Sequence, residues 1–265
     1  MSLQKAAICE VLGNHPWSSL VQVYKEVDST NTMLKAMASD GAPEGTVILA
    51  DSQSAGRGRM GRQFLSPEGQ GIYLSALLRP KCQPQELMHL TCAVAAVLCG
   101  AVEKVTGLRP EIKWTNDLVA GGHKVAGILT ELSLSSSGVD YAVVGVGINC
   151  NQEPEEFPEE LRKIAGSLAM AGGKKVNREA LAAECIRAIG TLQDSLIPNR
   201  LAFMEQYRRD CVTLGKEVLV QKGEQQRRGT ALDIDDWGAL LVDFGNGPET
   251  VLAGEVSVRG MYGYL

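Results

Sequence analysis

The sequence predicts an α+β protein in two parts, a larger mixed region over residues 1–211 and a small all-β region over residues 212–265. A length of 265 residues corresponds to about two domains. Helical and strand-like apolar patterns alternate through the larger region. From Leu214 onward, short β-type runs follow one another with Gly, Asp and Pro between them, which is typical of a small barrel.

The first half of the larger region contains two β-type runs between two helical patterns. A short helix is expected to begin near Asn31, because Asp28 to Asn31 supply residue types that cap helix N-termini. Val47 to Ala50 and Gly71 to Leu78 are expected to be strands, and a long glycine-rich polar loop separates them. From Leu87 to Val105 apolar residues recur at three- and four-residue steps, which predicts a helix packed against the core.

The second half predicts an antiparallel hairpin, two more helices and then a change of pattern. Lys124 to Leu134 and Val139 to Cys150 are β-type runs joined by the compact turn Ser135 to Gly138. Helical patterns follow over 178–195 and 199–211. Beyond residue 212, where we place the domain boundary, short strands are expected at 218–220, 229–233, 239–243 and 256–258.

Composition excludes several functional classes. The chain carries 26 Lys and Arg against 31 Asp and Glu, a net charge of -5, so its surface is not generally suited to neutralising nucleic-acid phosphates. Its seven cysteines form no C-x-x-C pair, which argues against a disulfide framework or a zinc ribbon and favours a cytoplasmic protein. The longest apolar tract, about Leu87 to Val105, is interrupted by charged residues, and the N-terminus lacks a signal-peptide pattern. Neither export nor membrane insertion is expected.

The segment Gly56 to Gly61 matches G-x-G-x-x-G but lacks the context of a dinucleotide site. No strand runs directly into it, no helix follows, and no acidic residue stands about 20 positions further on. Arg57, Arg59 and Arg62 instead indicate an anion site, because guanidinium groups hold phosphate or carboxylate in a fixed orientation and glycines let backbone N–H groups approach a ligand. A solvated basic loop or an RNA-binding Arg-Gly segment is the alternative interpretation.

Two further segments could contribute polar groups to a site. Lys113 to Asp117 follows a predicted strand end, and its lysine could contact a phosphoryl group. The plain alternatives are a surface lysine and, at Trp114, a core aromatic residue. Gly145 to Asn149 places two glycines in a β-branched strand, which indicates either close approach by a ligand or another backbone, or a bulge.

Five segments, in this order along the chain, resemble the biotin–protein ligase family, of the biotin-[acetyl-CoA-carboxylase] ligase type. They are Val27-Asp-Ser-Thr-Asn31, Gln53-Ser-Ala-Gly-Arg-Gly-Arg-Met-Gly-Arg62, Lys113-Trp-Thr-Asn-Asp117, Lys124-Val-Ala-Gly-Ile-Leu-Thr-Glu131 and Gly145-Val-Gly-Ile-Asn149. The resemblance covers residues from about 24 to 151 and extends to the strands after residue 212. It implies a class II synthetase-like catalytic domain, a mixed sheet with helices, over residues 1–211 and a C-terminal SH3-like β-barrel over residues 212–265.

The resemblance also implies a two-step reaction. The carboxylate of biotin attacks the α-phosphate of ATP, which is supplied with Mg²⁺, to give biotinyl-5′-AMP and pyrophosphate. A lysine of the biotin carboxyl carrier domain of a carboxylase then takes the biotinyl group. A homodimer is considered, and neither nucleic acid nor a membrane is expected as a partner. A lipoate ligase, which shares the general fold and the adenylate chemistry, and a non-catalytic biotin or nucleotide sensor are the alternatives.

The resemblance assigns roles to individual residues of this chain. Lys113 is implied as an electrostatic catalyst that neutralises charge between the carboxylate and the α-phosphate, and Arg59 as a catalytic residue of a loop that closes over the adenylate. The implied biotin site consists of Ser29, Thr30, Asn31, Gln53, Gly56, Arg57, Gly58, Arg59, Lys113 and Gly145. The implied ATP and adenylate site consists of Arg59, Arg62, Asn116, Lys124, Gly147 and Asn149. No metal ligand is implied.

The chain departs from the family pattern in two places. Thr115 stands where the family usually has proline, which leaves Lys113, Asn116 and Asp117 in place. About 20 residues precede the matched region, too few for the N-terminal helix-turn-helix domain of members that also repress transcription. We therefore expect a ligase without a DNA-binding function.

Overall fold

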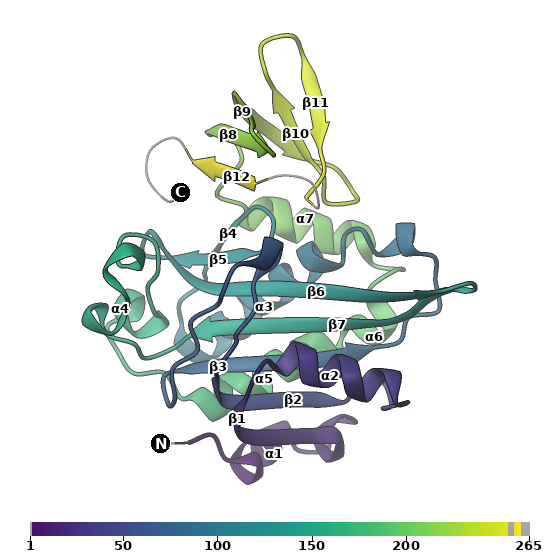
Figure 1. Cartoon of the computed structure of the whole chain (residues 1–265), viewed down its shortest axis with the longest axis vertical. Coiled ribbons are helices and arrows are strands. Elements are labelled where there is room, and N and C mark those ends of the chain that lie inside the picture. The colour runs from purple at the N-terminus through teal and green to yellow at the C-terminus, as the bar shows by residue number, and fades with distance from the viewer. Residues whose placement is uncertain (1, 254–256, 261–265) are drawn as a thin grey trace.

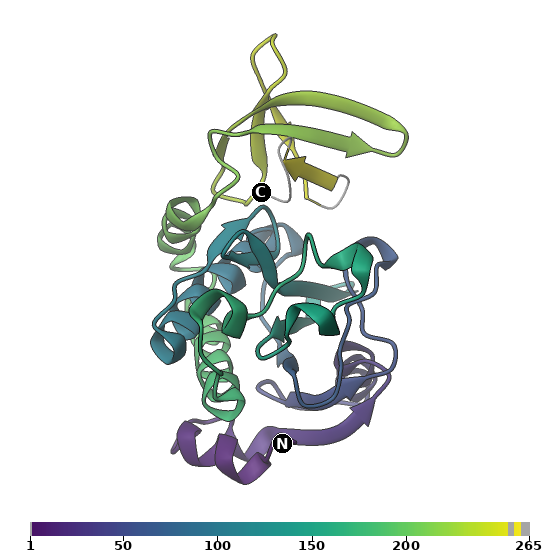
Figure 2. The same ribbon diagram turned by 90° about the vertical axis from the view of Figure 1, so that its left-hand side faces the viewer.

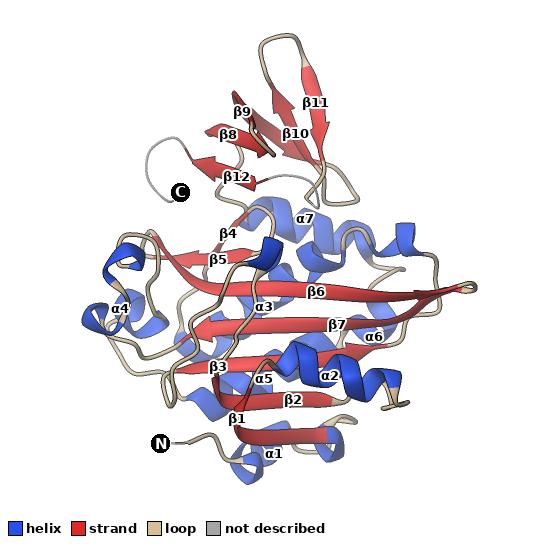
Figure 3. Ribbon diagram, in the orientation of Figure 1, coloured by secondary structure: helices blue, strands red, loops and turns tan. Residues whose placement is uncertain are grey.

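The computed structural model describes residues 2–253 and 257–260 of the chain. Within these ranges the chain forms a seven-stranded mixed sheet with helices on both faces, and a five-stranded antiparallel sheet that lies above it in Figure 1. The secondary structure coloured in Figure 3 confirms the α+β class expected from the sequence.

The larger sheet has the strand order β1-β2-β3-β7-β6-β5-β4. β1 and β2 are parallel, and every other neighbouring pair in this sheet is antiparallel. The predicted hairpin is confirmed as β6 and β7, which form the two long central strands of Figure 1. The strands are β1 Val21–Val27, β2 Val47–Gln53, β3 Gly71–Leu78, β4 Glu111–Lys113, β5 Asp117–Ala120, β6 His123–Ser135 and β7 Gly138–Asn149.

Alternate residues of the strands supply two apolar clusters, one on each face of the larger sheet. On β2, Val47 and Leu49 belong to the cluster formed with α3 and α5, whereas Ile48 belongs to the cluster formed with α2. The predicted core helix is confirmed as α3, which ends at Gly107 with a left-handed φ of 76°. The helices are α1 Lys5–Leu12, α2 Thr30–Ser39, α3 Leu90–Thr106, α4 Leu168–Gly172, α5 Arg178–Gly190, α6 Leu192–Ser195 and α7 Arg200–Asp210.

The segment that contains α3 has the length and apolar composition of a membrane span. It runs from Pro84 to Thr106, and 67% of its most apolar window is buried inside the fold. Because α3 packs against α5, α7 and β6, we interpret it as the core helix of a globular protein.

The smaller sheet follows α7 and is antiparallel throughout. Its strand order is β11-β10-β9-β8-β12. Among the described residues no ladder joins β11 to β12, so the expected SH3-like barrel is here an open sheet; Val256, which begins the last predicted strand, lies outside the described residues. The strands are β8 Glu217–Lys222, β9 Gln225–Ile234, β10 Leu240–Asp243, β11 Pro248–Val251 and β12 Ser257–Gly260.

The two sheets are joined through α7 and a shared apolar core. Figure 2, turned by 90°, shows the smaller sheet above the larger one with α7 beside the junction. The backbone N–H of Val212 donates to Ile112 of β4, and buried residues of both sheets belong to one continuous cluster. The domain boundary at residue 212 stays a prediction.

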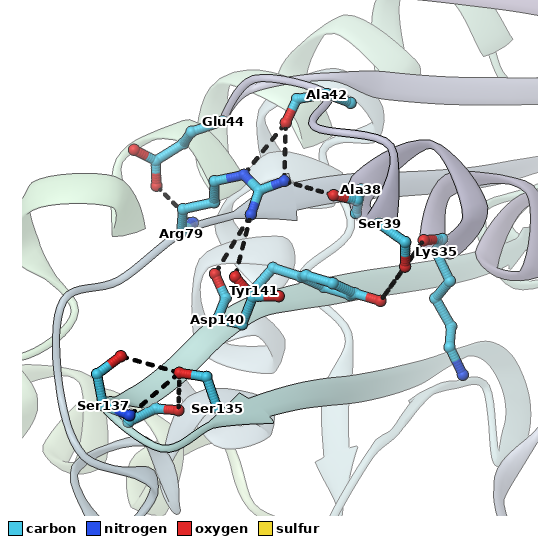
Figure 4. A network of polar contacts seen from close by, with 11 residues as sticks. Lys35, Ala38, Ser39, Ala42, Glu44, Arg79, Ser135, Ser137, Asp140 and Tyr141 are labelled. Atoms are coloured by element: carbon cyan, nitrogen blue, oxygen red, sulfur yellow. Dashed lines mark hydrogen bonds and ion pairs between the residues drawn. The ribbon is translucent and has the colours of Figure 1, made fainter.

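Helix α2 is attached to its surroundings at both ends. At its N-terminus, Ser29 caps the helix by accepting a hydrogen bond from the backbone N–H of Thr32, at 3.5 Å. Near its C-terminus, Figure 4 shows the guanidinium of Arg79 donating to the carbonyl oxygens of Ala38 and Ala42, at 2.6 and 3.0 Å. Arg79 also forms an ion pair with Asp140, at 3.6 Å, so α2, β3 and β7 are joined there. This attachment fixes the position of the residues that α2 presents at its other end.

Candidate active site

A cavity of about 760 Å³ lies where α2 begins, between strands β6 and β7 and the loop that joins β2 to β3. We call that loop, residues 54–70, the Arg-Gly loop. Of the residues predicted from the sequence, the cavity is lined by Ser29, Thr30, Asn31, Gln53, Arg57, Gly58, Arg59, Arg62, Lys113, Asn116, Lys124, Gly145, Gly147 and Asn149. Gly56 is outside this lining. It is buried, and a Cβ atom there would lie 2.7 Å from Ser66 Oγ.

Glycines of β7 form part of the cavity wall and allow side chains to lie against the strand. Gly145 is paired with Leu129 of β6, and a Cβ atom at Gly145 would lie 2.7 Å from Cγ of Asn31. Gly147 is paired with Gly127, and a Cβ atom at Gly147 would lie 2.5 Å from the ring of Phe64. The two glycines singled out from the sequence therefore provide close approach by side chains, and no register shift is found at either of them.

A compact polar network occupies the end of the cavity next to α2. The backbone N–H of Thr30 donates to Gln53 Oε1 at 2.9 Å, and the Thr30 hydroxyl donates to the same oxygen at 3.2 Å. Gln53 Nε2 donates to Ser66 Oγ at 2.8 Å. The orientation of the Gln53 amide is therefore set by protein groups, and one N–H of its Nε2 atom has no further partner among these bonds.

Asn31 is oriented in the same way. It is 4% exposed, and its Nδ2 atom donates to the carbonyl oxygen of Leu129 at 3.2 Å and to Glu131 Oε2 at 3.0 Å. Both amide protons are thereby used, which leaves the carbonyl side of Asn31 as the group that it can offer to a ligand. Ser75 Oγ lies 2.5 Å from Asn31 Oδ1 and fixes that oxygen in turn.

The Arg-Gly loop folds back over the cavity in a tight turn. The backbone N–H of Gly58 donates to Arg62 O at 2.7 Å, and a single bridge pairs Arg57 with Gln63. Met60 and Gly61, at the tip, have left-handed φ values of 55° and 73°. The turn carries three arginines to the same cavity, as expected for an anion site.

Arg59 connects this loop to both sheets. Its Nη1 donates to Asn116 Oδ1 at 2.7 Å, and its Nη2 donates to the carbonyl oxygen of Ala253 beyond β11. Burial lowers the pKa of the Arg59 guanidinium, the charge of Asp117 acts to raise it, and Arg62 acts to lower it. Such a desolvated cation interacts more strongly with an anion than a cation in water does.

The turn between β4 and β5 carries the second predicted cluster. Lys113 ends β4 opposite Asp117 of β5, and both line the cavity. Asp117 Oδ1 forms an ion pair with Lys124 Nζ at 2.7 Å. Trp114, which also lines the cavity, is 5% exposed, and its indole N–H donates at 2.9 Å to the carbonyl oxygen of Gly238, between β9 and β10. Trp114 therefore belongs both to the apolar core and to the cavity wall.

Asn149 lies at the far end of the cavity and holds a neighbouring segment. Its Nδ2 donates to Gly166 O at 3.0 Å and its Oδ1 accepts from Gln152 at 3.2 Å. These bonds bring residues 157–165 to the cavity wall, where Phe157, Leu161 and Ile164 add apolar surface. No local pattern in the acidic stretch 153–160 indicated this placement.

Several other residues at the site were not singled out from the sequence. Phe64 lines the cavity against Gly147, and its ring contacts Tyr73 edge-on with centroids 6.4 Å apart. Glu131 of β6 accepts a hydrogen bond from Asn31, and Ser75 of β3 donates one to Asn31. Glu131 stands within a segment of the family resemblance, whereas Ser75 lies in an ordinary apolar run. In the described ranges no three His, Cys, Asp or Glu side chains gather into a group that could hold a metal ion.

Comparison with known proteins places these features in a family. Residues 23–149 match the profile described as "Biotin/lipoate A/B protein ligase family", and residues 213–259 match "Biotin protein ligase C terminal domain". The bifunctional ligase/repressor BirA of Bacillus subtilis is 35% identical over 266 residues, which cover 94% of this chain and 75% of that protein. The biotin--[acetyl-CoA-carboxylase] ligase of Mycobacterium tuberculosis is 34% identical over 249 residues, covering 91% and 89%.

A solved structure agrees with the sequence comparison. The biotin protein ligase from Aquifex aeolicus in complex with biotin and ATP superposes with a TM-score of 0.77 at 32% identity. The match covers 91% of this chain and 98% of that chain. The similarity therefore extends over most of the chain, and the two family profiles together cover the residues of the cavity in 29–149 and the smaller sheet.

Proposed function

The chain belongs to the biotin/lipoate A/B protein ligase family, and from this premise we propose that it is an ATP-dependent biotin–protein ligase. In the first step a carboxylate oxygen of biotin bonds to the α-phosphorus of ATP, and the bond to the bridging oxygen breaks to release pyrophosphate. In the second, the amine of an acceptor lysine bonds to the biotinyl carbonyl carbon, loses a proton and releases AMP. The acceptor is a carrier protein of a carboxylase.

The observation that carries this proposal is the arrangement of amides beside α2. Asn31 presents a carbonyl oxygen and Gln53 an N–H group, and protein contacts fix both. A cyclic urea, such as the ureido ring of biotin, has N–H donors and a carbonyl acceptor that complement them. The dithiolane ring of lipoate has neither group, so it would leave buried polar atoms unpaired at about 1–3 kcal/mol each. Lipoate ligation is therefore not favoured.

The cations around the cavity suit the charge that the reaction develops. The biotin carboxylate and the α-phosphate are both anionic and repel each other as they approach. Lys113 and Arg59 both line the cavity, and we assign them to the neutralisation of this charge. A donor placed in advance for such a transition state typically contributes about 3–4 kcal/mol. Arg62 and Lys124 are assigned to the phosphate end.

We expect ATP to bind as its Mg²⁺ complex. Two carboxylates line the cavity, Asp117 and Glu160, and Asp117 already accepts from Lys124. Mg²⁺ in nucleotide sites commonly takes one or two carboxylates and completes its shell with phosphates and water. The residues present fit a cation that the triphosphate carries, and Asp117, whose Oδ1 lies 2.7 Å from Lys124 Nζ, is a carboxylate beside a predicted phosphate contact. We further infer a cytoplasmic reaction without a nucleic-acid partner; the homodimer stays a prediction.

The deciding experiment incubates the pure protein with ATP, Mg²⁺, biotin and a carrier domain, and measures both pyrophosphate release and labelled acceptor on an avidin blot. Biotin should support both signals and lipoate neither. The Lys113→Ala variant, which we expect to keep the fold, is the matched negative control. Biotin binding without pyrophosphate release would indicate a sensor, and the absence of labelled acceptor in the presence of a functional carrier domain would refute ligation.

A further inference from the structure

Glu131 is a partly buried carboxylate that contacts two residues of the cavity lining, Asn31 and Arg57. It lies on β6, two residues beyond Leu129, so both side chains belong to the same face of the sheet. Its side chain is 17% exposed. Three donors from two distant parts of the chain meet at this one carboxylate, and no role in the proposed reaction has been given to it.

Two of the donors come from successive turns of α2 and the third from the Arg-Gly loop. Asn31 Nδ2 lies 3.0 Å from Glu131 Oε2, and Lys35 Nζ lies 2.9 Å from Oε1. Arg57 Nη1 lies 3.2 Å from Oε1. Burial acts to raise the pKa of Glu131, but the bonds from Lys35 and Asn31 and the charge of Arg57 outweigh it, so the pKa is lowered. Glu131 is therefore an anion at neutral pH.

Each side of Glu131 controls a different part of the site. On the α2 side, it takes one of the two protons of the Asn31 amide and so directs the Asn31 carbonyl oxygen toward Ser75 and the cavity. On the loop side, Arg57 is the residue at which the turn closes, through its bridge to Gln63. The position of Arg57 therefore sets the position of the arginines that follow it in the turn.

We propose that Glu131 is a positioning residue that couples the biotin subsite to the Arg-Gly loop, by holding the Asn31 amide with one oxygen and the Arg57 guanidinium with the other. This inference rests on the proposed function. Glu131 contacts no reacting atom in it. Its charge keeps the loop close to the subsite before ligand arrives, and the same contact slows the escape of the adenylate afterwards.

The Glu131→Gln variant tests this coupling. The amide has the size of the carboxylate and can still accept from Asn31, but it forms no ion pair with Arg57. In the ligand-free protein we expect peptides over residues 54–65 to exchange backbone hydrogen about fivefold faster in E131Q than in the wild type. The effect is this small because the lost ion pair is half-exposed. Gly58 and Phe64, whose N–H groups bond within the loop, are the reporters. Biotinyl-AMP should dissociate about fivefold faster.

Lys35→Gln is the matched control. It removes a cation from the same carboxylate but leaves Arg57 and Asn31 in place, so loop exchange and adenylate dissociation should remain those of the wild type. Raising the salt concentration should bring the wild-type loop toward the exchange rate of E131Q, because a half-exposed pair is screened, whereas a purely structural defect would not respond.

Equal loop exchange in wild type and E131Q would overturn the proposal, and so would faster exchange spread evenly into β7. A wild-type protein that forms no biotinyl-AMP would instead refute the proposed function. In that case the exchange of the ligand-free protein would still decide whether Glu131 holds the loop.

Discussion

Replacing Gly145 by alanine should weaken biotin binding by displacing Asn31. The new Cβ atom would lie 2.7 Å from Asn31 Cγ and 2.8 Å from Nδ2, and closer still to Oδ1, whereas ordinary contacts begin at 3.4 Å. Asn31 is 4% exposed, so its amide has to rotate out of a packed site and give up its bonds to Leu129, Glu131 and Ser75.

The size of the effect follows from those bonds. A neutral buried hydrogen bond contributes about 1 kcal/mol and one to a charged group about 1.5–3 kcal/mol. Losing the two neutral bonds, to Leu129 and Ser75, and the charged one, to Glu131, predicts a decrease of about 3–5 kcal/mol in the free energy of unfolding. Loss of the acceptor for a ureido N–H weakens the free energy of biotin binding by about 1–3 kcal/mol, which raises Kd roughly 5- to 150-fold. Urea unfolding and titration calorimetry with biotin measure the two quantities.

Two controls make the reasoning refutable. Gly100→Ala is the same substitution inside α3, where no atom lies within 4 Å of the new methyl group. It should leave biotin affinity unchanged and raise stability by about 0.5–1 kcal/mol, as expected for Gly→Ala in a helix. In an Asn31→Ala background, Gly145→Ala should cost no further stability, because the clash has been removed. Wild-type biotin affinity in G145A, or an undiminished stability cost in the Asn31→Ala background, would refute the argument.

Three other substitutions test the rest of the site. Lys113→Ala should slow pyrophosphate release by about 10²–10³-fold with an unchanged unfolding midpoint, and release at the wild-type rate would exclude Lys113 from the reaction. Arg59→Gly removes the bond to Asn116 and the contact with Ala253, so biotinyl-AMP should dissociate faster; an unchanged rate in a chase experiment would show that the loop does not retain the adenylate. Trp114→Phe deletes the indole N–H that donates to Gly238 O and should lower the free energy of unfolding by about 1–3 kcal/mol, which superimposable urea curves would contradict.

The sequence predicts the elements whose apolar pattern is long or whose turn is short. α3 and the β6–β7 hairpin are of this kind. β1 was not predicted, because it is an edge strand with few buried positions and pairs in parallel with a strand more than twenty residues away. β11 was missed as well, since it begins with proline and three of its four residues are exposed.

The site residues divide in the same way, into those that a local pattern reveals and those that depend on distant contacts. Residues within short motifs, such as Arg57 and Lys113, could be named from their neighbours in the chain. Glu131 acts on Asn31 across 100 residues and on Arg57 across 74, so no local pattern reveals those contacts. Gly56 illustrates the opposite case, because it belongs to the motif but lies outside the cavity lining beside Ser66.

The attachment of α2 at both ends determines when the conformational entropy of binding is lost. Ser29 at one end and Arg79 at the other restrain the helix during folding, so Thr30 and Asn31 are already ordered when biotin arrives. Biotin then loses mainly its own freedom, and little further ordering of the protein opposes its binding. Any ordering that remains belongs to the Arg-Gly loop, whose Arg62 is assigned to the phosphate end, so we expect the nucleotide step to carry the larger share of it. The balance of enthalpy and entropy should therefore differ between the two substrates even though they share one cavity.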